Sequence, residues 1–148
     1  MPHLTMLYTP QLDRPAHEGG ADMGALCRSL ADTLLAQRDE TGAAVFPPGG
    51  IRVLAFPSTH HAVADGGTAG KAAGGSGDYA FVYINLRMAR GRSPMVLGQV
   101  GRALEACARD HLAPQLTRLH MGLTVQIDEG HEAFDGKTST LHPLFGRI

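Results

Sequence analysis

The chain has 148 residues, with 13 Lys and Arg against 14 Asp and Glu, and a formal net charge of -1 at pH 7. This balance lacks the basic excess that binding to a phosphate backbone requires, so we expect no nucleic-acid partner. Because the sequence has no apolar run of membrane-spanning length, no charged-then-apolar leader and only two cysteines, we expect a cytoplasmic protein that does not associate with membranes.

The first half of the chain predicts the order strand, helix, strand. Residues 3–9 are rich in β-favouring types and stop at a proline, which indicates a short strand followed by a loop. Asp22 is placed to cap a helix over 22–38, whose apolar residues recur at three- and four-residue steps. After a Pro-Pro-Gly-Gly turn, residues 51–56 predict a second strand.

The second half repeats this order. Residues 78–88 alternate as a strand does and carry apolar side chains on both faces, so we expect this strand to be central. Ser93 followed by proline begins a second helix, which we expect to end near Pro114. Residues 119–128 predict the last long strand. Joining the two halves gives a β-α-β-β-α-β order.

The segment between the halves, residues 65–77, contains six glycines and three alanines among thirteen residues. We expect a mobile loop there, because the segment has few side chains to bury and a backbone that is costly to fix.

This pattern predicts an α+β fold of two fused β-α-β units that form one mixed sheet with two helices on one face. The chain is then a single domain over 1–148, with pseudo-repeat halves of about 1–64 and 78–148. Several strand positions on the sheet face without helices are also apolar. We therefore expect another copy of the chain to cover that face.

Pro2 is the first residue that suggests chemistry. A small second residue permits removal of Met1, which leaves proline with a free secondary amine that can act as a base. An exposed amino terminus titrates near pH 8, and burial or a neighbouring guanidinium lowers its pKa toward neutrality, where acid–base catalysis works best. From Met-Pro alone, a proline that merely starts the chain is the commoner explanation.

Three ordered blocks and the tail carry a resemblance to a known family. The blocks are Pro2-His3, Gly50-Ile51-Arg52 preceded by Phe46-Pro47 and Gly49, and Asp78–Val82 continuing to Gly91-Arg92-Ser93; the tail residues are His142, Leu144 and Phe145. Together they resemble the 5-carboxymethyl-2-hydroxymuconate isomerase family of the tautomerase superfamily, over nearly the whole chain apart from two loops.

The resemblance implies two fused β-α-β units assembled as a homotrimer. It also implies cofactor-free enol-to-ketone isomerisation of a polycarboxylated muconate during catabolism of homoprotocatechuate. Carried over residue by residue, it makes Pro2 the base, and it makes Arg52 and Arg92 the candidates for holding carboxylates of the small-molecule substrate.

The chemistry of arginine supports these assignments. A guanidinium presents paired donors that match a carboxylate, and it can stabilise an oxygen on which negative charge develops. Arg52 follows a Gly-Gly turn, and Arg92 precedes a helix whose first N–H groups would attract an anion. The alternative for each residue is a solvated surface charge or an interface ion pair.

Other candidates are weaker. His60 and His61 are adjacent, so on a strand they point to opposite faces, and no supporting ligand stands at a suitable spacing; we expect no metal site. His3 fits a sheet or interface role at least as well as a catalytic one. Cys27 and Cys107 fall on the apolar stripes of the two helices, where a thiol behaves as a small hydrophobe.

The sequence also departs from the family pattern. Leu7-Tyr8 stands where more polar residues are expected, which would change what the pocket wall can bind. Segments 10–21 and 65–77 are longer than the fold needs, and we favour tolerated surface loops over covers for the pocket. The alternative function is a non-catalytic trimeric protein of the same fold that binds small molecules. Retention of Met1 would favour it, because the Pro2 nitrogen would then be a tertiary amide.

Overall fold

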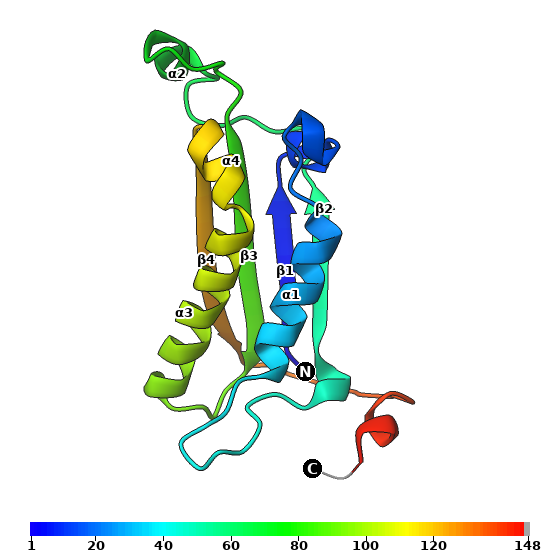
Figure 1. Cartoon of the computed structure of the whole chain (residues 1–148). Coiled ribbons are helices and arrows are strands. Elements are labelled where there is room, and N and C mark those ends of the chain that lie inside the picture. Colours follow the sequence, from blue (N-terminus) through cyan, green and yellow to red (C-terminus); the bar gives the residue numbers. More distant parts are fainter. Residues whose placement is uncertain (147–148) are drawn as a thin grey trace.

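Four strands form one mixed sheet in the computed structural model, which describes residues 1–146 (Figure 1). The strands are β1 (His3–Tyr8), β2 (Arg52–Pro57), β3 (Ala80–Ala89) and β4 (Met121–Gly130), and their order across the sheet is β2-β1-β3-β4. β1 is parallel to β2, β3 is parallel to β4, and β1 is antiparallel to β3. The predicted mixed sheet of two β-α-β units is confirmed.

The two long helices, α1 (Met23–Leu35) and α3 (Pro94–His111), lie side by side on one face of the sheet (Figure 1). Asp22 caps α1 as predicted, with its carboxylate accepting from the backbone N–H of Ala25 at 3.0 Å. α1 is shorter than the expected 22–38. α3 ends just before Pro114, but that proline then lies in the first turn of a further short helix, α4 (Ala113–Arg118), which the sequence did not predict.

The core lies between the sheet and these helices. Alternate residues of β1 and β3 point toward the helices and are almost completely buried, and they meet buried residues of α1 and α3: Leu4, Met6, Val82, Ile84, Leu86, Leu26, Leu30, Val100 and Leu104. A slip of one residue in either strand would move its apolar set to the other face, so burial fixes the register of β1 on β3.

The opposite face of the sheet divides into an apolar and a polar half. On β1 and β2, Leu7, Leu54 and Phe56 are 41%, 49% and 49% exposed, which confirms the apolar positions predicted on this face. On β3 and β4, Tyr83 donates to the Gln126 side chain at 2.9 Å. The Asn85 amide likewise donates to the Asp128 carboxylate at 2.8 Å. The apolar half is therefore the part of this face that we expect another molecule to bury.

Residues 65–77, where we expected a mobile loop, contain a short helix, α2 (Thr68–Ala72), that the sequence did not predict. The Asp65 carboxylate accepts from two backbone N–H groups, and the N–H of Gly70 donates to the Tyr79 hydroxyl at 2.8 Å. A Cβ atom at Gly70 would lie 2.6 Å from the Tyr79 ring and 3.1 Å from His120. The small residues therefore serve close packing onto two aromatic rings.

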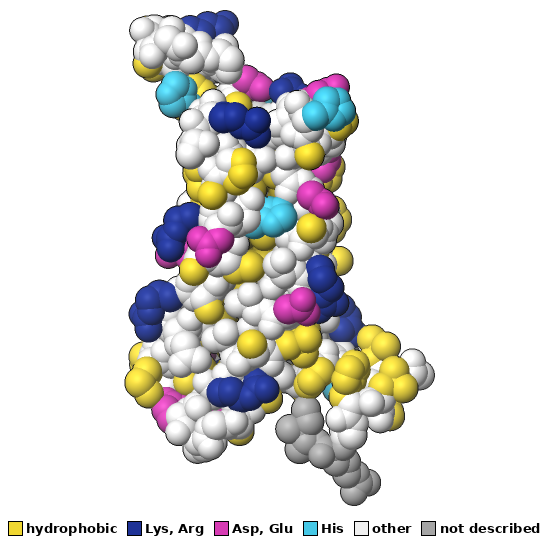
Figure 2. Space-filling view, in the orientation of Figure 1, with side chains coloured by type: hydrophobic (Ala, Val, Ile, Leu, Met, Phe, Trp, Pro, Cys, Tyr) yellow, Lys and Arg dark blue, Asp and Glu magenta, His cyan; other side chains and the backbone are white. Residues whose placement is uncertain are grey.

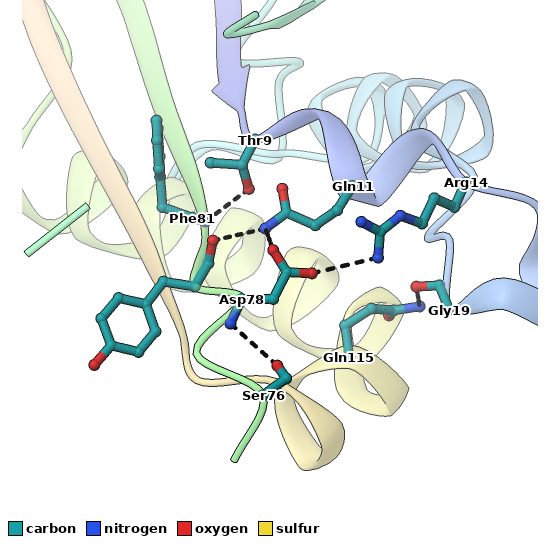
Figure 3. Close-up of polar contacts among 9 residues, drawn as sticks. Thr9, Gln11, Arg14, Gly19, Ser76, Asp78, Phe81 and Gln115 are labelled. Carbon is teal, nitrogen blue, oxygen red and sulfur yellow. Dashed lines mark hydrogen bonds and ion pairs between the residues drawn. The ribbon is translucent and has the colours of Figure 1, made fainter. Parts of the chain in front are cut away.

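Segment 10–21 is tied to the start of β3 (Figure 3). Thr9 exchanges two hydrogen bonds with Phe81, each of 3.1 Å, and the buried Gln11 amide donates to the Tyr79 carbonyl at 2.6 Å. Gln115 of α4 donates to the Gly20 carbonyl at 2.9 Å. Since β1 ends where β3 begins, segments 10–21 and 65–77 both lie at the end of the sheet opposite Pro2. Within one chain both segments therefore lie away from the hollow at the amino terminus.

The surface carries charges of both signs on one face and a short apolar helix near the amino terminus. On the helix-covered face, Lys and Arg side chains alternate with Asp and Glu instead of gathering in one basic patch (Figure 2). Near the amino terminus, the short helix η4 (His142–Phe145) exposes Leu144 and Phe145. Within residues 1–146, every helix is too short or too polar to cross a bilayer.

Replacing Gly70 with alanine is expected to lower the free energy of unfolding by about 1–3 kcal/mol, because the new methyl group overlaps the Tyr79 ring. The sign is informative, since alanine in place of a helical glycine ordinarily stabilises a protein by about 0.4–1 kcal/mol. Urea denaturation followed by circular dichroism measures the change. The control Gly122→Ala on β4, where a Cβ would meet open space, should stay within about 0.5 kcal/mol of the unaltered protein. A Gly70→Ala protein as stable as that control would contradict the packing.

Candidate active site

Pro2 lies at the end of the sheet where β1 and β2 begin and β3 ends (Figure 1). The register places His3 opposite Arg52 on β2 and opposite Arg87 on β3. The backbone N–H of Arg52 donates to the Pro2 carbonyl at 3.2 Å, and the Pro2 side chain is buried. The parallel and antiparallel pairings thus bring the amino terminus, two arginines and the start of α3 to the same end of the sheet.

A hollow of about 200 Å³ lies at the amino terminus. Met1 lines it together with His3 and Arg87 from the strands, and with Glu132, Asp135 and Lys137 from the segment after β4. Met1 also packs on the Gly50 turn, where an added Cβ would lie 3.3 Å from the Met1 Cγ atom. Pro2 itself does not line this hollow, but its nitrogen is bonded to Met1, which does.

Exposed ion pairs surround this hollow. The Arg87 guanidinium is 4.0 Å from the Glu132 carboxylate, and Lys137 contacts the Asp135 carboxylate. The Lys137 ammonium also holds the pKa of Asp135 below its ordinary value, by its hydrogen bond first and by its charge second. The site therefore holds two cations beside the amino terminus, each facing a solvent-screened carboxylate.

Arg52 reaches the same edge but not the same hollow. Its guanidinium donates to the carbonyls of Gly49 and Ile51 at 2.9 and 2.8 Å. It lines a larger hollow of about 550 Å³ between α1 and β2, where Cys27 and Phe145 also lie. The short helix η4 packs closely on the turn that contains Gly49. Within one chain, the Arg52 side chain thus lines a different hollow from Met1.

Arg92 is fixed at the start of α3. Its guanidinium donates to the carbonyls of Ala89 and Val45 at 2.9 and 3.1 Å, and it lies over the Phe46 ring at 5.6 Å from the ring centroid. Together with Arg90 it lines a third hollow, of about 230 Å³. Arg92 therefore ties the turn after β3 to the segment before β2, and it holds a rigid cation at this edge.

The other residues considered as candidates pack or hydrogen-bond within the fold. Cys27 and Cys107 pack against the core as predicted, and burial raises the pKa of the Cys27 thiol. The His61 ring contacts the Ser58 carbonyl at 2.9 Å, and residues 1–146 contain no cluster of metal-ligating side chains. Tyr8 lies at the end of β1 remote from Pro2 and donates to Asp13, so within one chain it does not line the hollow at the amino terminus.

Sequence reasoning missed Arg87, Glu132 and Lys137. Arg87 shares a face of β3 with Tyr83 and Asn85 by simple alternation, so its face could be predicted. Its position beside the amino terminus could not, because that depends on the pairing of His3 with Arg87 across the sheet. Glu132 and Lys137 lie in an irregular segment that carries no periodic signal.

Comparisons with known proteins point to one family. A family model described as 5-carboxymethyl-2-hydroxymuconate isomerase matches residues 2–145. A curated 5-carboxymethyl-2-hydroxymuconate Delta-isomerase from Escherichia coli is 31% identical over 125 residues, which are 84% of this chain and 87% of the relative.

Solved structures agree with that match. A crystal structure of a 5-carboxymethyl-2-hydroxymuconate delta-isomerase is 53% identical, with a TM-score of 0.92 over 100% of this chain and 95% of the other. A 5-carboxymethyl-2-hydroxymuconate isomerase from Deinococcus radiodurans R1 is 30% identical, with a TM-score of 0.78 over 99% of this chain and 95% of the other.

A more distant likeness concerns the fold alone. A fused 4-OT, described as a wild-type symmetric trimer, is 18% identical with a TM-score of 0.52, over 99% of this chain and 98% of the other. The arrangement of two β-α-β units is thus shared beyond the closer relatives.

Replacing Arg92 with alanine is expected to lower the free energy of unfolding by about 1–2 kcal/mol, because two backbone carbonyls lose a charged donor at a half-buried site. Arg90→Ala in the same turn is the matched control, because Arg90 is exposed, and its loss should cost less than about 0.5 kcal/mol. Guanidinium chloride denaturation measures both. Equal stability of the two variants would show that the Arg92 contacts contribute nothing to folding.

Proposed function

Because the chain belongs to the 5-carboxymethyl-2-hydroxymuconate isomerase family, we propose that it isomerises 5-carboxymethyl-2-hydroxymuconate or a related carboxylated enol in aromatic-compound catabolism. In this proposal the amine of Pro2, freed by removal of Met1, is the general base, and the reaction needs no cofactor. The enzyme class, an isomerase, is that of the relatives over most of the chain.

The position of the amino terminus is the observation that carries the proposed mechanism. The Pro2 nitrogen is bonded to Met1, and Met1 lines a hollow that also contains two cationic side chains. A neutral secondary amine there can accept the proton of the enol hydroxyl, and the electron pairs of the conjugated double bonds then shift toward carbon. The same amine returns the proton to a carbon atom, so atoms and electrons balance without an oxidant or reductant.

Guanidinium groups can bind the negative charges of the substrate and of the transition state. Negative charge develops on the enol oxygen and is already present on the carboxylates, and both are matched by planar, permanently charged donors. We keep Arg52 and Arg92 as substrate-binding residues in the proposal. Since their side chains line other hollows of the same chain, they would act at the border of the Pro2 site, or at the site of a neighbouring chain.

We further propose a homotrimer in the cytoplasm. The exposed Leu7, Leu54 and Phe56 form an apolar surface that a neighbouring copy would cover, and the distant fused 4-OT with the same fold is a trimer. The two cysteines are both free, which suits a reducing compartment.

The turnover number of the processed protein is expected to rise with pH through one apparent pKa below the value of about 8 for an ordinary amino terminus. The amine must be neutral to accept a proton, so activity is lost as pH falls below that pKa. The ultraviolet change of a 2-hydroxymuconate, followed from pH 5 to 9, measures the profile. Pro2→Ala, which leaves a primary amine on a more flexible chain, should lower kcat by about tenfold or more.

His3→Gln is the matched control, because His3 follows Pro2 in the chain and lines the same hollow as Met1. Its pH profile should keep the midpoint of the unaltered protein. A profile that becomes flat in His3→Gln, or a Pro2→Ala protein with full activity, would exclude Pro2 as the base.

A further inference from the structure

We propose that Arg87, assisted by Lys137, forms a carboxylate-binding subsite beside the Pro2 nitrogen. The subsite takes one carboxylate end of the substrate and is distinct from the positions of Arg52 and Arg92. This inference rests on the proposed function of the same site, and it names the residues that hold the substrate closest to the base.

The position of Arg87 follows from the register of the sheet. Arg87 is paired with His3, one residue from Pro2, and paired residues on neighbouring strands point to the same face. Both side chains line the hollow of about 200 Å³ that Met1 also lines. Among the arginines of residues 1–146, Arg87 is the one that lines this hollow.

The hydrogen-bonding state of Arg87 also sets it apart. Arg52 and Arg92 each donate to two backbone carbonyls. In the part of the chain that the structure describes, the Arg87 guanidinium makes no hydrogen bond, and its nearest carboxylate, Glu132, is 4.0 Å away. Its paired N–H donors are thus available for a carboxylate, which is the partner they match best.

The protein nevertheless holds this guanidinium in place. A Cβ atom at Gly130, at the end of β4, would lie 2.9 Å from an Arg87 guanidinium nitrogen and 2.3 Å from the Glu132 carboxylate. The side chain of Arg87 therefore crosses the end of β4 over bare backbone, and glycine is the residue that permits this close approach. The Glu132 carboxylate lies 4.0 Å from this guanidinium.

Lys137 supplies a second positive charge in the same hollow. It comes from the segment after β4 and pairs with Asp135, and both side chains are about half exposed. Ion pairs of this kind contribute little because water screens them, so a substrate carboxylate can replace Asp135 or Glu132 at small cost. The hollow is smaller than a usual site for a whole ligand, which suits one carboxylate end.

Binding of cis,cis-muconate, a dicarboxylate that lacks the reacting enol, tests the subsite directly. Isothermal titration of processed protein is expected to give a Kd that rises by about tenfold or more in Arg87→Gln, because a charged hydrogen-bond pair is lost. Arg87→Lys should recover part of the affinity, and Lys137→Gln should raise the Kd less than Arg87→Gln does. Arg102→Gln, on the exposed face of α3, is the matched control and should stay within about twofold.

Thermal unfolding of every variant shows whether each one is folded, and Arg87→Lys keeps the test valid if Arg87→Gln is unstable. An Arg87→Gln protein that binds muconate as Arg102→Gln does would overturn the proposal. So would an unaltered protein that does not bind muconate at millimolar concentration.

Turnover separates this inference from the proposed function. If processed protein binds muconate through Arg87 but does not isomerise a 2-hydroxymuconate, the function fails and the subsite stands. If Arg87→Gln isomerises that enol with unchanged KM and kcat, the subsite fails and the function stands.

Discussion

The antiparallel pairing of β1 with β3 is the constraint on which the rest of the structure depends. It joins two parallel β-α-β units into one sheet, and it places the beginning of β1 against the end of β3. The amino terminus, the start of β2 and the start of α3 therefore lie together at one end of the sheet. Buried residues on the helix side, such as Met6 and Ile84, hold the register that makes His3 and Arg87 neighbours.

The two ends of the sheet have different roles because of this pairing. The remote end carries segment 10–21 and α2, whose hydrogen bonds to Tyr79 anchor them beside the beginning of β3. The end near Pro2 carries charged side chains and turns built on glycine, where backbone and side chains approach closely. Long connections are thus accommodated far from the candidate chemistry, and the amino terminus remains beside a hollow.

Local patterns were enough to predict the four strands, α1 and α3, because their apolar residues repeat with the periods of a strand or a helix. The same reasoning did not predict α2 within residues 65–77, because small residues indicate freedom in the unfolded chain but also allow Gly70 to pack on Tyr79 in the folded one. Nor did it place Arg87 beside the amino terminus, because that position depends on a pairing with His3, more than eighty residues away in the sequence. Pro2, Arg52 and Arg92 were found by resemblance, and the sequence could not reveal that both arginines donate to the chain's own carbonyls.

The central claim is that a free Pro2 nitrogen is the base, and the most direct measurement compares protein with and without Met1. Both forms would be identified by intact mass, shown by circular dichroism to share one fold, and assayed on the same 2-hydroxymuconate. A nitrogen bonded to Met1 is an amide and cannot accept a proton, so the account predicts turnover in the processed form and a loss of at least about hundredfold in the form that keeps Met1. Comparable rates in the two forms would contradict the account and assign the proton transfer to another residue.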